Sequence, residues 1–352
     1  MYMVETYTIP THELERGGTL QQAPVAFETW GMLNAEGSNA ILVCHALTGD
    51  THIDEWWSGL FGPGRVLDPT THFIVACNVL GSPYGSVSPL SVDPSTGQPY
   101  GPRFPDLTIR DTVAAQKQVL EHLGVQRLEL AIGGSMGGMQ VLEWAFYGKF
   151  VHALAVMAVG GRHSPWCIGW SEAQRHAIFA DPKWKGGEYD STDPPRAGLS
   201  AARMMAMIAY RSSLEFEARF GREAQPERDD LFAVQSYLQY QGQKLVDRFD
   251  ANCYVALTRQ MDTHDVARGR GAYPDVLAQI EQPTFILGID TDVLYPLHEQ
   301  RELATHIPNS HLHVVESLYG HDGFLIEQSN INDALLQWQQ PFLTASTSTV
   351  AA

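Results

Sequence analysis

Cysteine is scarce in this chain, with four residues in 352: Cys44, Cys77, Cys167 and Cys253. They stand far apart and form no C-x-x-C pair, which argues against a zinc site and against a disulfide framework. We therefore expect no bound metal. Each thiol is expected to be a small buried side chain in a reducing compartment, so the sequence predicts a cytoplasmic protein.

Positive charge and long apolar runs are also lacking. Lysine and arginine number 23 against 40 acidic residues, which gives a net charge of −17. So acidic a chain is not expected to bind nucleic acid or an anionic membrane nonspecifically. No apolar run reaches the roughly 18 residues of a membrane span, and from residues 1–6 we expect no secretory signal.

What is present is enough apolar sequence for a core, since 44% of the residues are hydrophobic. The length fits two average domains or one large α/β domain with an insertion. Strands buried on both faces of a parallel sheet are indicated by apolar runs at residues 40–44, 73–78, 128–132, 151–159, 283–290 and 311–316. Helical spacing at residues 108–123 and 139–145 alternates with these runs and predicts a right-handed parallel α/β sheet. A hairpin within residues 7–27 precedes it.

The pattern changes in the second half of the chain. Residues 162–273 contain no convincing strand, and helical spacing occurs instead at residues 171–180, 200–210, 229–246 and 252–261. We predict a first core part at residues 1–161, a helical lid at 162–276, a second core part at 277–343 and a disordered tail at 344–352. A lid closes over a site and excludes water. The alternative is an insertion without a role at the site, or one that forms a dimer interface. Separately, we expect the protein to be a homodimer.

A glycine-rich turn, Gly133-Gly-Ser-Met-Gly137, connects a predicted strand to a predicted helix. A serine in this context matches the G-x-S-x-G nucleophile elbow, in which neighbours without side chains permit a tight, strained turn. We predict Ser135 as the nucleophile and the backbone N–H of Met136 as an oxyanion donor at a helix start. The alternative is a turn that binds phosphate or only reverses the chain. The elbow hypothesis requires an acid and then a histidine later in the sequence.

The other parts of such a site follow in that order. The loop after residues 40–44 carries Leu47, the candidate for the second oxyanion donor. The run at residues 283–290 leads into Asp290-Thr-Asp292, and spacing alone does not decide between the two acids. His321 lies in a Gly-His-Asp loop after the last predicted strand and is the candidate general base.

With these motifs, the chain resembles the homoserine O-acetyltransferases, a family of methionine-biosynthesis enzymes with the α/β-hydrolase fold. The similarity covers about residues 27–336 and includes blocks at residues 43–50, 104–111, 132–145, 174–187, 202–212, 247–252, 260–262, 292–296 and 319–322. The block Asp-Arg-Phe-Asp-Ala-Asn at residues 247–252 is far more specific than the elbow. The resemblance implies a mostly parallel sheet flanked by helices, with an inserted helical lid. It also implies that Asp292, rather than Asp290, completes a triad with Ser135 and His321.

The resemblance further implies the residues that bind substrate. Arg203 on a lid helix would bind the substrate carboxylate, for which a planar guanidinium is suited. Asp322 would bind the amino group, and Tyr210 and Thr48 match further pocket residues. The segment Leu294-Tyr295-Pro296 resembles that of acetyl-CoA users, whereas succinyl-CoA users tend to carry an arginine there.

The implied function is ping-pong transfer of an acetyl group from acetyl-CoA, as acyl-donor substrate, to L-homoserine, without a cofactor. The alternatives are a serine O-acyltransferase, a homoserine acyltransferase that uses succinyl-CoA, and an esterase of the same fold. A further alternative is a non-catalytic protein of this fold, which would be expected to lack part of the triad.

Overall fold

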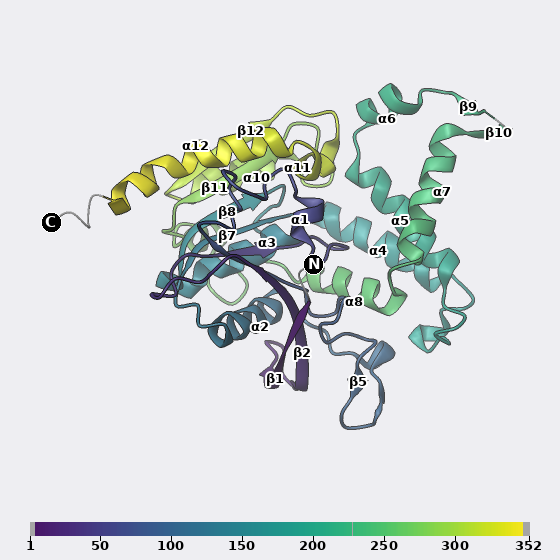
Figure 1. Ribbon diagram of the computed structural model, residues 1–352. Helices are drawn as coiled ribbons and strands as arrows, with labels where there is room; N and C mark the ends of the chain where they lie inside the picture. The colour runs from purple at the N-terminus through teal and green to yellow at the C-terminus, as the bar shows by residue number, and fades with distance from the viewer. Residues whose placement is uncertain (1–3, 227, 348–352) are drawn as a thin grey trace.

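A sheet of eight strands forms the centre of the computed structural model, which describes residues 4–226 and 228–347 (Figure 1). The strands lie in the order β1-β2-β4-β3-β7-β8-β11-β12. Their bounds are Glu5–Glu13 (β1), Thr19–Trp30 (β2), Ala40–Cys44 (β3), Phe73–Cys77 (β4), Leu128–Gly134 (β7), Val151–Met157 (β8), Thr284–Ile289 (β11) and Ser310–Val315 (β12). β2 pairs antiparallel with β1 and with β4, and the other neighbours are parallel. The predicted α/β class and its opening hairpin are confirmed.

The central strands are buried on both faces because helices cover both sides of the sheet. All five residues of β3 are buried. Leu42 faces a core shared with α2 (Ile109–His122) and α3 (Met136–Trp144). Val43 faces the opposite core, which includes side chains of α12 (Gln328–Thr347). Two buried faces explain why these strands have continuous apolar sequences rather than alternating ones.

A group of helices follows β8 and lies beside the sheet (Figure 1). Its members are α4 (Pro165–Phe179), α5 (Arg196–Tyr210), α6 (Ser213–Phe220), α7 (Ala233–Val246) and α8 (Ala251–Asp262). α5 packs against α4 and α7, and α4 also contacts α8. We refer to these helices as the lid; that they close over a site, and that the insertion spans residues 162–276, stay predictions from the sequence.

The expectation of no strand in residues 162–273 was wrong, because β9 (Ala224–Gln225) and β10 (Arg228–Phe232) form a small antiparallel ladder. The helix expected from residue 229 begins at residue 233 instead. Arg228 and Asp230, two positions apart on the strand, form an ion pair with Nε 2.9 Å from Oδ1. The side chain of Gln235 accepts the N–H of Phe232 at 2.8 Å, and this contact caps the start of α7.

The predicted disordered tail was wrong at its start, because α12 continues through residues 344–347. Each residue added to an existing helix gains a hydrogen bond, so small and polar residues can extend it. Residues 348–352 of the predicted tail lie outside the described residues.

In the part of the chain that the structure describes, the remaining elements are short, apart from α10, which follows the loop of Asp290 and Asp292. They are α1 (Ile53–Trp56), β5 (Val92–Asp93), β6 (Gln98–Pro99), α9 (Tyr273–Leu277), α10 (Leu297–His306), α11 (Gly323–Ile326) and four 3-10 helices, Gly101–Arg103, Ala145–Phe150, Lys185–Gly187 and Gly320–Asp322. Within residues 4–226 and 228–347, no helix has the length and apolar character needed to cross a membrane. The same residues contain no cluster of three or more His, Cys, Asp or Glu side chains placed to hold a metal.

Candidate active site

Ser135 lies at the turn between β7 and α3, as the glycine-rich pattern predicts. Its backbone has φ +55° and ψ −126°, a conformation that residues with a side chain rarely adopt. The Ser135 N–H donates to the carbonyl oxygen of Met157 on β8 at 2.9 Å, which fixes the turn. A Cβ on Gly137 would lie 2.0 Å from the carbonyl oxygen of Cys44. Glycine is therefore required where α3 crosses the end of β3.

His321 and Asp292 form a buried pair beside this turn. The Nδ1 atom of His321 lies 2.7 Å from Oδ2 of Asp292. The other carboxylate oxygen accepts the backbone N–H groups of Leu294 and Tyr295 at 2.8 and 2.9 Å. These contacts favour the imidazole tautomer with its proton on Nδ1 and leave Nε2 as the acceptor. Asp290 is exposed and accepts the N–H of residue 317 at 3.0 Å instead.

The second nitrogen of His321 is available for chemistry. Its Nε2 atom is buried and has no hydrogen-bond partner among the described residues. Aromatic rings pack around the imidazole, with the centroids of Tyr295, Phe324 and Tyr210 at 5.2, 5.4 and 5.7 Å from its own. These rings restrict the orientation of His321, which lines the same cavity as Ser135.

The two expected oxyanion donors lie at a helix start and in a fixed loop. Met136 is the first residue of α3, and N–H groups in the first turn have no partner within their helix. Leu47 is buried in the loop after β3 and lines the cavity. His45 holds this loop, because its Nδ1 donates to the carbonyl oxygen of Ala46 at 2.8 Å and its Nε2 accepts the N–H of Val79 at 3.0 Å. Burial lowers the pKa of His45, which favours the neutral ring that these contacts need.

A cavity of about 460 Å³ lies between the core and the lid. Most of the residues singled out from the sequence line it: Leu47, Thr48, Ser135, His321 and Asp322 from the core, and Arg203 and Tyr210 from the lid. Met136 and Asp292 are buried beneath this surface. Further charged or polar side chains line it as well: Lys244 and Arg248 from the lid, and Asp50, His52 and Glu55 from the core.

Arg203 and Asp322 bring opposite charges to the cavity. The Nη1 atom of Arg203 is buried without a hydrogen-bond partner in the described part of the chain, and its guanidinium lies 5.5 Å from the centre of the Tyr210 ring. Burial raises the pKa of Asp322 despite the opposing effect of Arg211, whose Nε atom lies 2.9 Å from Oδ2 of Asp322. A buried donor of a charged group without a hydrogen-bond partner is costly, so the Nη1 atom of Arg203 indicates a site for an anionic group.

Two arginines near the site were missed from the sequence. Arg211 pairs with Asp322, and Arg248 donates from Nη1 to the carbonyl oxygen of Thr48 at 2.9 Å and to the hydroxyl of Tyr84. A lid residue thus holds the loop that carries Leu47. The available signal was that both arginines lie in blocks of family resemblance, residues 202–212 and 247–252.

The mostly parallel sheet, the strained serine turn and the histidine–aspartate pair define a protein of the α/β-hydrolase fold. A family model described as the alpha/beta hydrolase fold matches residues 39–328. A homoserine O-acetyltransferase of Salinibacter ruber is 60% identical over 343 residues, covering 96% of this chain and 97% of that protein. One of Trichormus variabilis is 53% identical, covering 96% and 94%. The chain belongs to the homoserine O-acetyltransferase family.

The fold is shared with hydrolytic enzymes. The solved structure of esterase E22 superposes on this chain with a TM-score of 0.88 at 26% identity, covering 96% of this chain and 100% of that one. The arrangement of the sheet therefore does not by itself separate acyl transfer to an amino acid from ester hydrolysis.

Proposed function

We propose that this chain transfers the acetyl group of acetyl-CoA to the hydroxyl of L-homoserine, a step in methionine biosynthesis, through an acyl-serine intermediate. The observation that carries the proposal is the His321–Asp292 pair, in which Nδ1 of His321 lies 2.7 Å from the carboxylate. Nε2 of His321 has no hydrogen-bond partner among the described residues, and His321 lines the same cavity as Ser135. The names of relatives at 60% and 53% identity support homoserine as the acceptor and acetyl as the group transferred.

The first half-reaction loads the serine. Nε2 of His321 takes the proton of Ser135 Oγ, which attacks the thioester carbonyl carbon of acetyl-CoA. Asp292 orients the imidazole and stabilises its positive charge. The N–H groups of Leu47 and Met136 stabilise the oxyanion, and one such donor contributes about 3–4 kcal/mol. The C–S bond then breaks, CoA leaves with the proton from His321, and an acetyl ester remains on Ser135.

The second half-reaction transfers the acetyl group. Arg203 binds the carboxylate of homoserine and Asp322 its ammonium group, with Tyr210 and Thr48 completing the pocket. His321 removes the proton of the homoserine hydroxyl, whose oxygen attacks the ester carbonyl, and the proton returns to the serine as O-acetylhomoserine leaves. A hydroxyl held in this way reaches an effective molarity of about 10⁵ M or more, which lets it compete with water.

Acetyl-CoA, rather than succinyl-CoA, is supported by the residue beside the catalytic histidine. Tyr295 is buried there, and its hydroxyl lies 3.1 Å from Nδ1 of His163. A tyrosine offers no positive charge to the second carboxylate of a succinyl group.

Serine as an acceptor is shorter than homoserine by one methylene, a difference worth about 1–3 kcal/mol in a fitted pocket.

The second candidate function is an esterase, which the similarity to esterase E22 favours. In that case water is the acceptor, and no amino acid increases the rate. The opposite charges of Arg203 and Asp322, which line the same cavity from the lid and from the core, favour a zwitterionic acceptor instead.

The test measures CoA release from acetyl-CoA or succinyl-CoA, each with homoserine, with serine and without an acceptor. We expect release from acetyl-CoA that depends on homoserine, and Ser135→Ala should abolish it. A preference for serine or succinyl-CoA would retain the triad but assign a sister activity. Release that is independent of every amino acid would contradict the transferase and support the esterase.

We propose further that the chain forms a homodimer through the lid in the cytoplasm. Apolar side chains on three lid helices support self-association, since Ile208, Leu214 and Tyr240 are 46%, 56% and 62% exposed. The four cysteines are free and buried, which is compatible with a reducing compartment.

A further inference from the structure

Arg211 connects the lid to the loop that carries His321 and Asp322. It follows α5 directly, and its Nε atom lies 2.9 Å from Oδ2 of Asp322. Its Nη1 atom lies 3.6 Å from Oε1 of Glu215 on α6. The side chains of Arg211, Asp322 and Glu215 are 14%, 16% and 6% exposed, so these charges face one another largely away from water.

The backbone around Arg211 is packed against the same loop. Ser212 Oγ donates a hydrogen bond to the carbonyl oxygen of Leu318. A Cβ on Gly320, whose φ is +61°, would lie 2.8 Å from the carbonyl carbon of Arg211. Because the two backbones are in direct contact, the end of α5 cannot move without shifting the loop of His321.

We propose that Arg211 is a positioning residue that keeps Asp322 ionised and oriented to bind the ammonium group of the acceptor. The inference rests on the proposed function, since that function assigns Asp322 to the amino group of homoserine. Arg211 engages Oδ2 and leaves Oδ1 to the substrate. Without Arg211, a carboxyl group in this enclosed site would tend to bind a proton and lose its attraction for an ammonium ion.

The groups around Asp322 show why Arg211 matters. The titratable and charged side chains that act on Asp322 or are acted on by it are Arg211, His321, Arg203, Asp292, Tyr210 and Tyr237. Burial raises the pKa of Asp322 most, Arg211 is the strongest of the charges that lower it, and Asp292 raises it further. An opposite charge within about 4–6 Å lowers the pKa of a carboxyl group by roughly one to three. Loss of Arg211 should therefore raise the pKa of Asp322 toward neutral pH.

The experiment measures how the acetylated enzyme divides between homoserine and water as the pH changes. Both routes require His321, but only transfer requires Asp322, so the ratio of O-acetylhomoserine to acetate isolates the second group. The wild-type ratio should be nearly flat between about pH 6 and pH 8. In Arg211→Gln the ratio should be about tenfold lower at pH 6 and should recover toward pH 8. Hydrolysis of p-nitrophenyl acetate should keep its pH profile.

Arg219→Gln is the matched control, because Arg219 pairs with the same Glu215 at 3.3 Å and forms no ion pair with Asp322 in the described residues. It should leave the ratio unchanged. Arg211→Lys should give a smaller decrease at low pH, since one ammonium group does not hold both carboxylates, and it serves as the test if Arg211→Gln does not fold. A ratio that is unchanged in the Arg211 variants, or that falls equally at every pH, overturns the proposal. Wild-type enzyme without homoserine-dependent transfer overturns the proposed function and this inference together.

Discussion

Arg203 places a positive charge at the cavity of a chain whose net charge is −17, and its Nη1 atom is buried without a partner in the described residues. A hydrogen bond to a charged group contributes about 1.5–3 kcal/mol, which corresponds to about 10- to 150-fold. Arg203→Met should lower kcat/KM for homoserine by this factor and leave hydrolysis of the acetylated enzyme nearly unchanged. Arg196→Met, which removes an exposed arginine from the same helix, is the control. Equal losses of transfer and hydrolysis would count against the carboxylate clamp.

Glu299 is a buried carboxyl group on α10, near the triad acid. Its Oε2 atom has no hydrogen-bond partner among the described residues, and a Cβ on Gly160 would lie 2.4 Å from it. Burial raises the pKa of Glu299 from 4.5 to about 7, and the charge of Asp292 contributes to the increase. The folded protein therefore keeps a proton that the unfolded chain releases. Because of this proton, the free energy of unfolding falls as the pH rises from 4.5 to about 7. Above pH 7 the whole of this loss of stability is present.

Glu299→Gln removes this titration and keeps the shape of the side chain. The difference in free energy of unfolding, variant minus wild type, should be about 2–3 kcal/mol larger at pH 8 than at pH 4.5, because only the wild type loses stability over this range. Urea denaturation at the two pH values measures the change. Glu302→Gln, on the same helix with a side chain that is 38% exposed, should show no such increase. A difference between Glu299→Gln and wild type that is independent of pH would mean that Glu299 is ionised in the folded protein throughout this range.

At the scale of helices and strands, the core could be predicted because its local signals agree. The sequence predicts a strand at residues 40–44 and a helix at 108–123, and the structure has β3 at Ala40–Cys44 and α2 at Ile109–His122. Thr108 and Asp111 form a reciprocal capping box at the start of that helix. β9 and β10 could not be predicted in this way, because none of their side chains whose burial is described is buried, and their short sequences show no apolar alternation.

The site could be predicted as far as it depends on chain order. Parallel strands bring their carboxyl ends to one edge of the sheet, so the elbow, the acid and the histidine were expected to meet. Spacing could not separate Asp290 from Asp292, since both follow the same strand, whereas the backbone N–H groups at residues 294 and 295 hold only Asp292 of the two. The contact of Arg248 with Thr48 joins residues 200 positions apart and depends on how the lid packs on the core.

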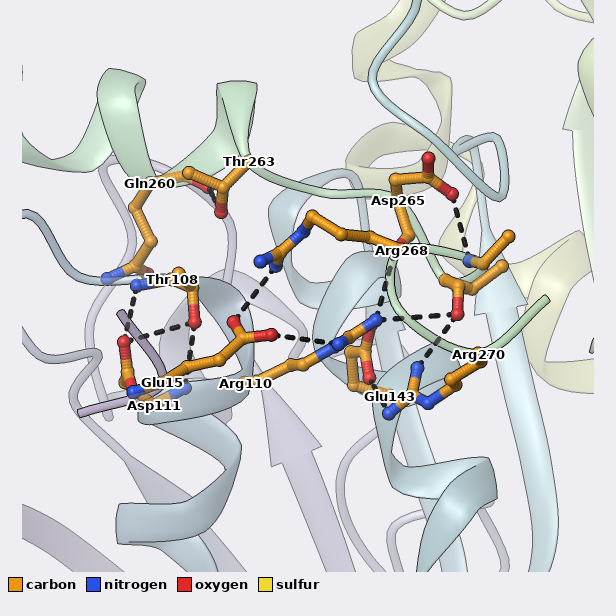
Figure 2. A network of polar contacts seen from close by, with 12 residues as sticks. Glu15, Thr108, Arg110, Asp111, Glu143, Gln260, Thr263, Asp265, Arg268 and Arg270 are labelled. Atoms are coloured by element: carbon orange, nitrogen blue, oxygen red, sulfur yellow. Dashed lines mark hydrogen bonds and ion pairs between the residues drawn. The ribbon is translucent and has the colours of Figure 1, made fainter. Parts of the chain in front are cut away.

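At the scale of the whole molecule, a network of charges joins the segment that follows α8 to the core. Figure 2 shows Glu143 of α3 between Arg110 of α2 and Arg270. Oε1 of Glu143 lies 3.1 Å from Nε of Arg110, and its Oε2 lies 2.7 Å from Nη2 of Arg270. Both arginines also donate to the carbonyl oxygen of Val266, at 3.4 and 2.9 Å. The network thus ties residues 265–270, which follow α8, to the helix that begins at the nucleophile turn.

Glu143 is the member whose loss should matter most, because its side chain is 3% exposed and faces two arginines. Glu143→Gln keeps the size of the side chain but removes the carboxylate that Arg270 faces, whereas Arg110 keeps its ion pair with Glu15 at 2.8 Å. We expect it to lower the free energy of unfolding by about 3–5 kcal/mol in urea denaturation, since removing one partner of a buried pair leaves an uncompensated charge. High salt should restore little of this loss, because buried pairs are poorly screened.

Arg268→Gln provides the comparison within the same network. Arg268 pairs with Glu15 at 2.9 Å, but its side chain is 31% exposed, so its loss should cost no more than about 1 kcal/mol. Limited proteolysis adds a spatial readout: Glu143→Gln should become sensitive between residues 265 and 270, where the segment loses its anchor, while wild type and Arg268→Gln resist cleavage. Equal destabilisation of the two variants, or cleavage only within the lid helices, would mean that Glu143 does not hold residues 265–270 to the core.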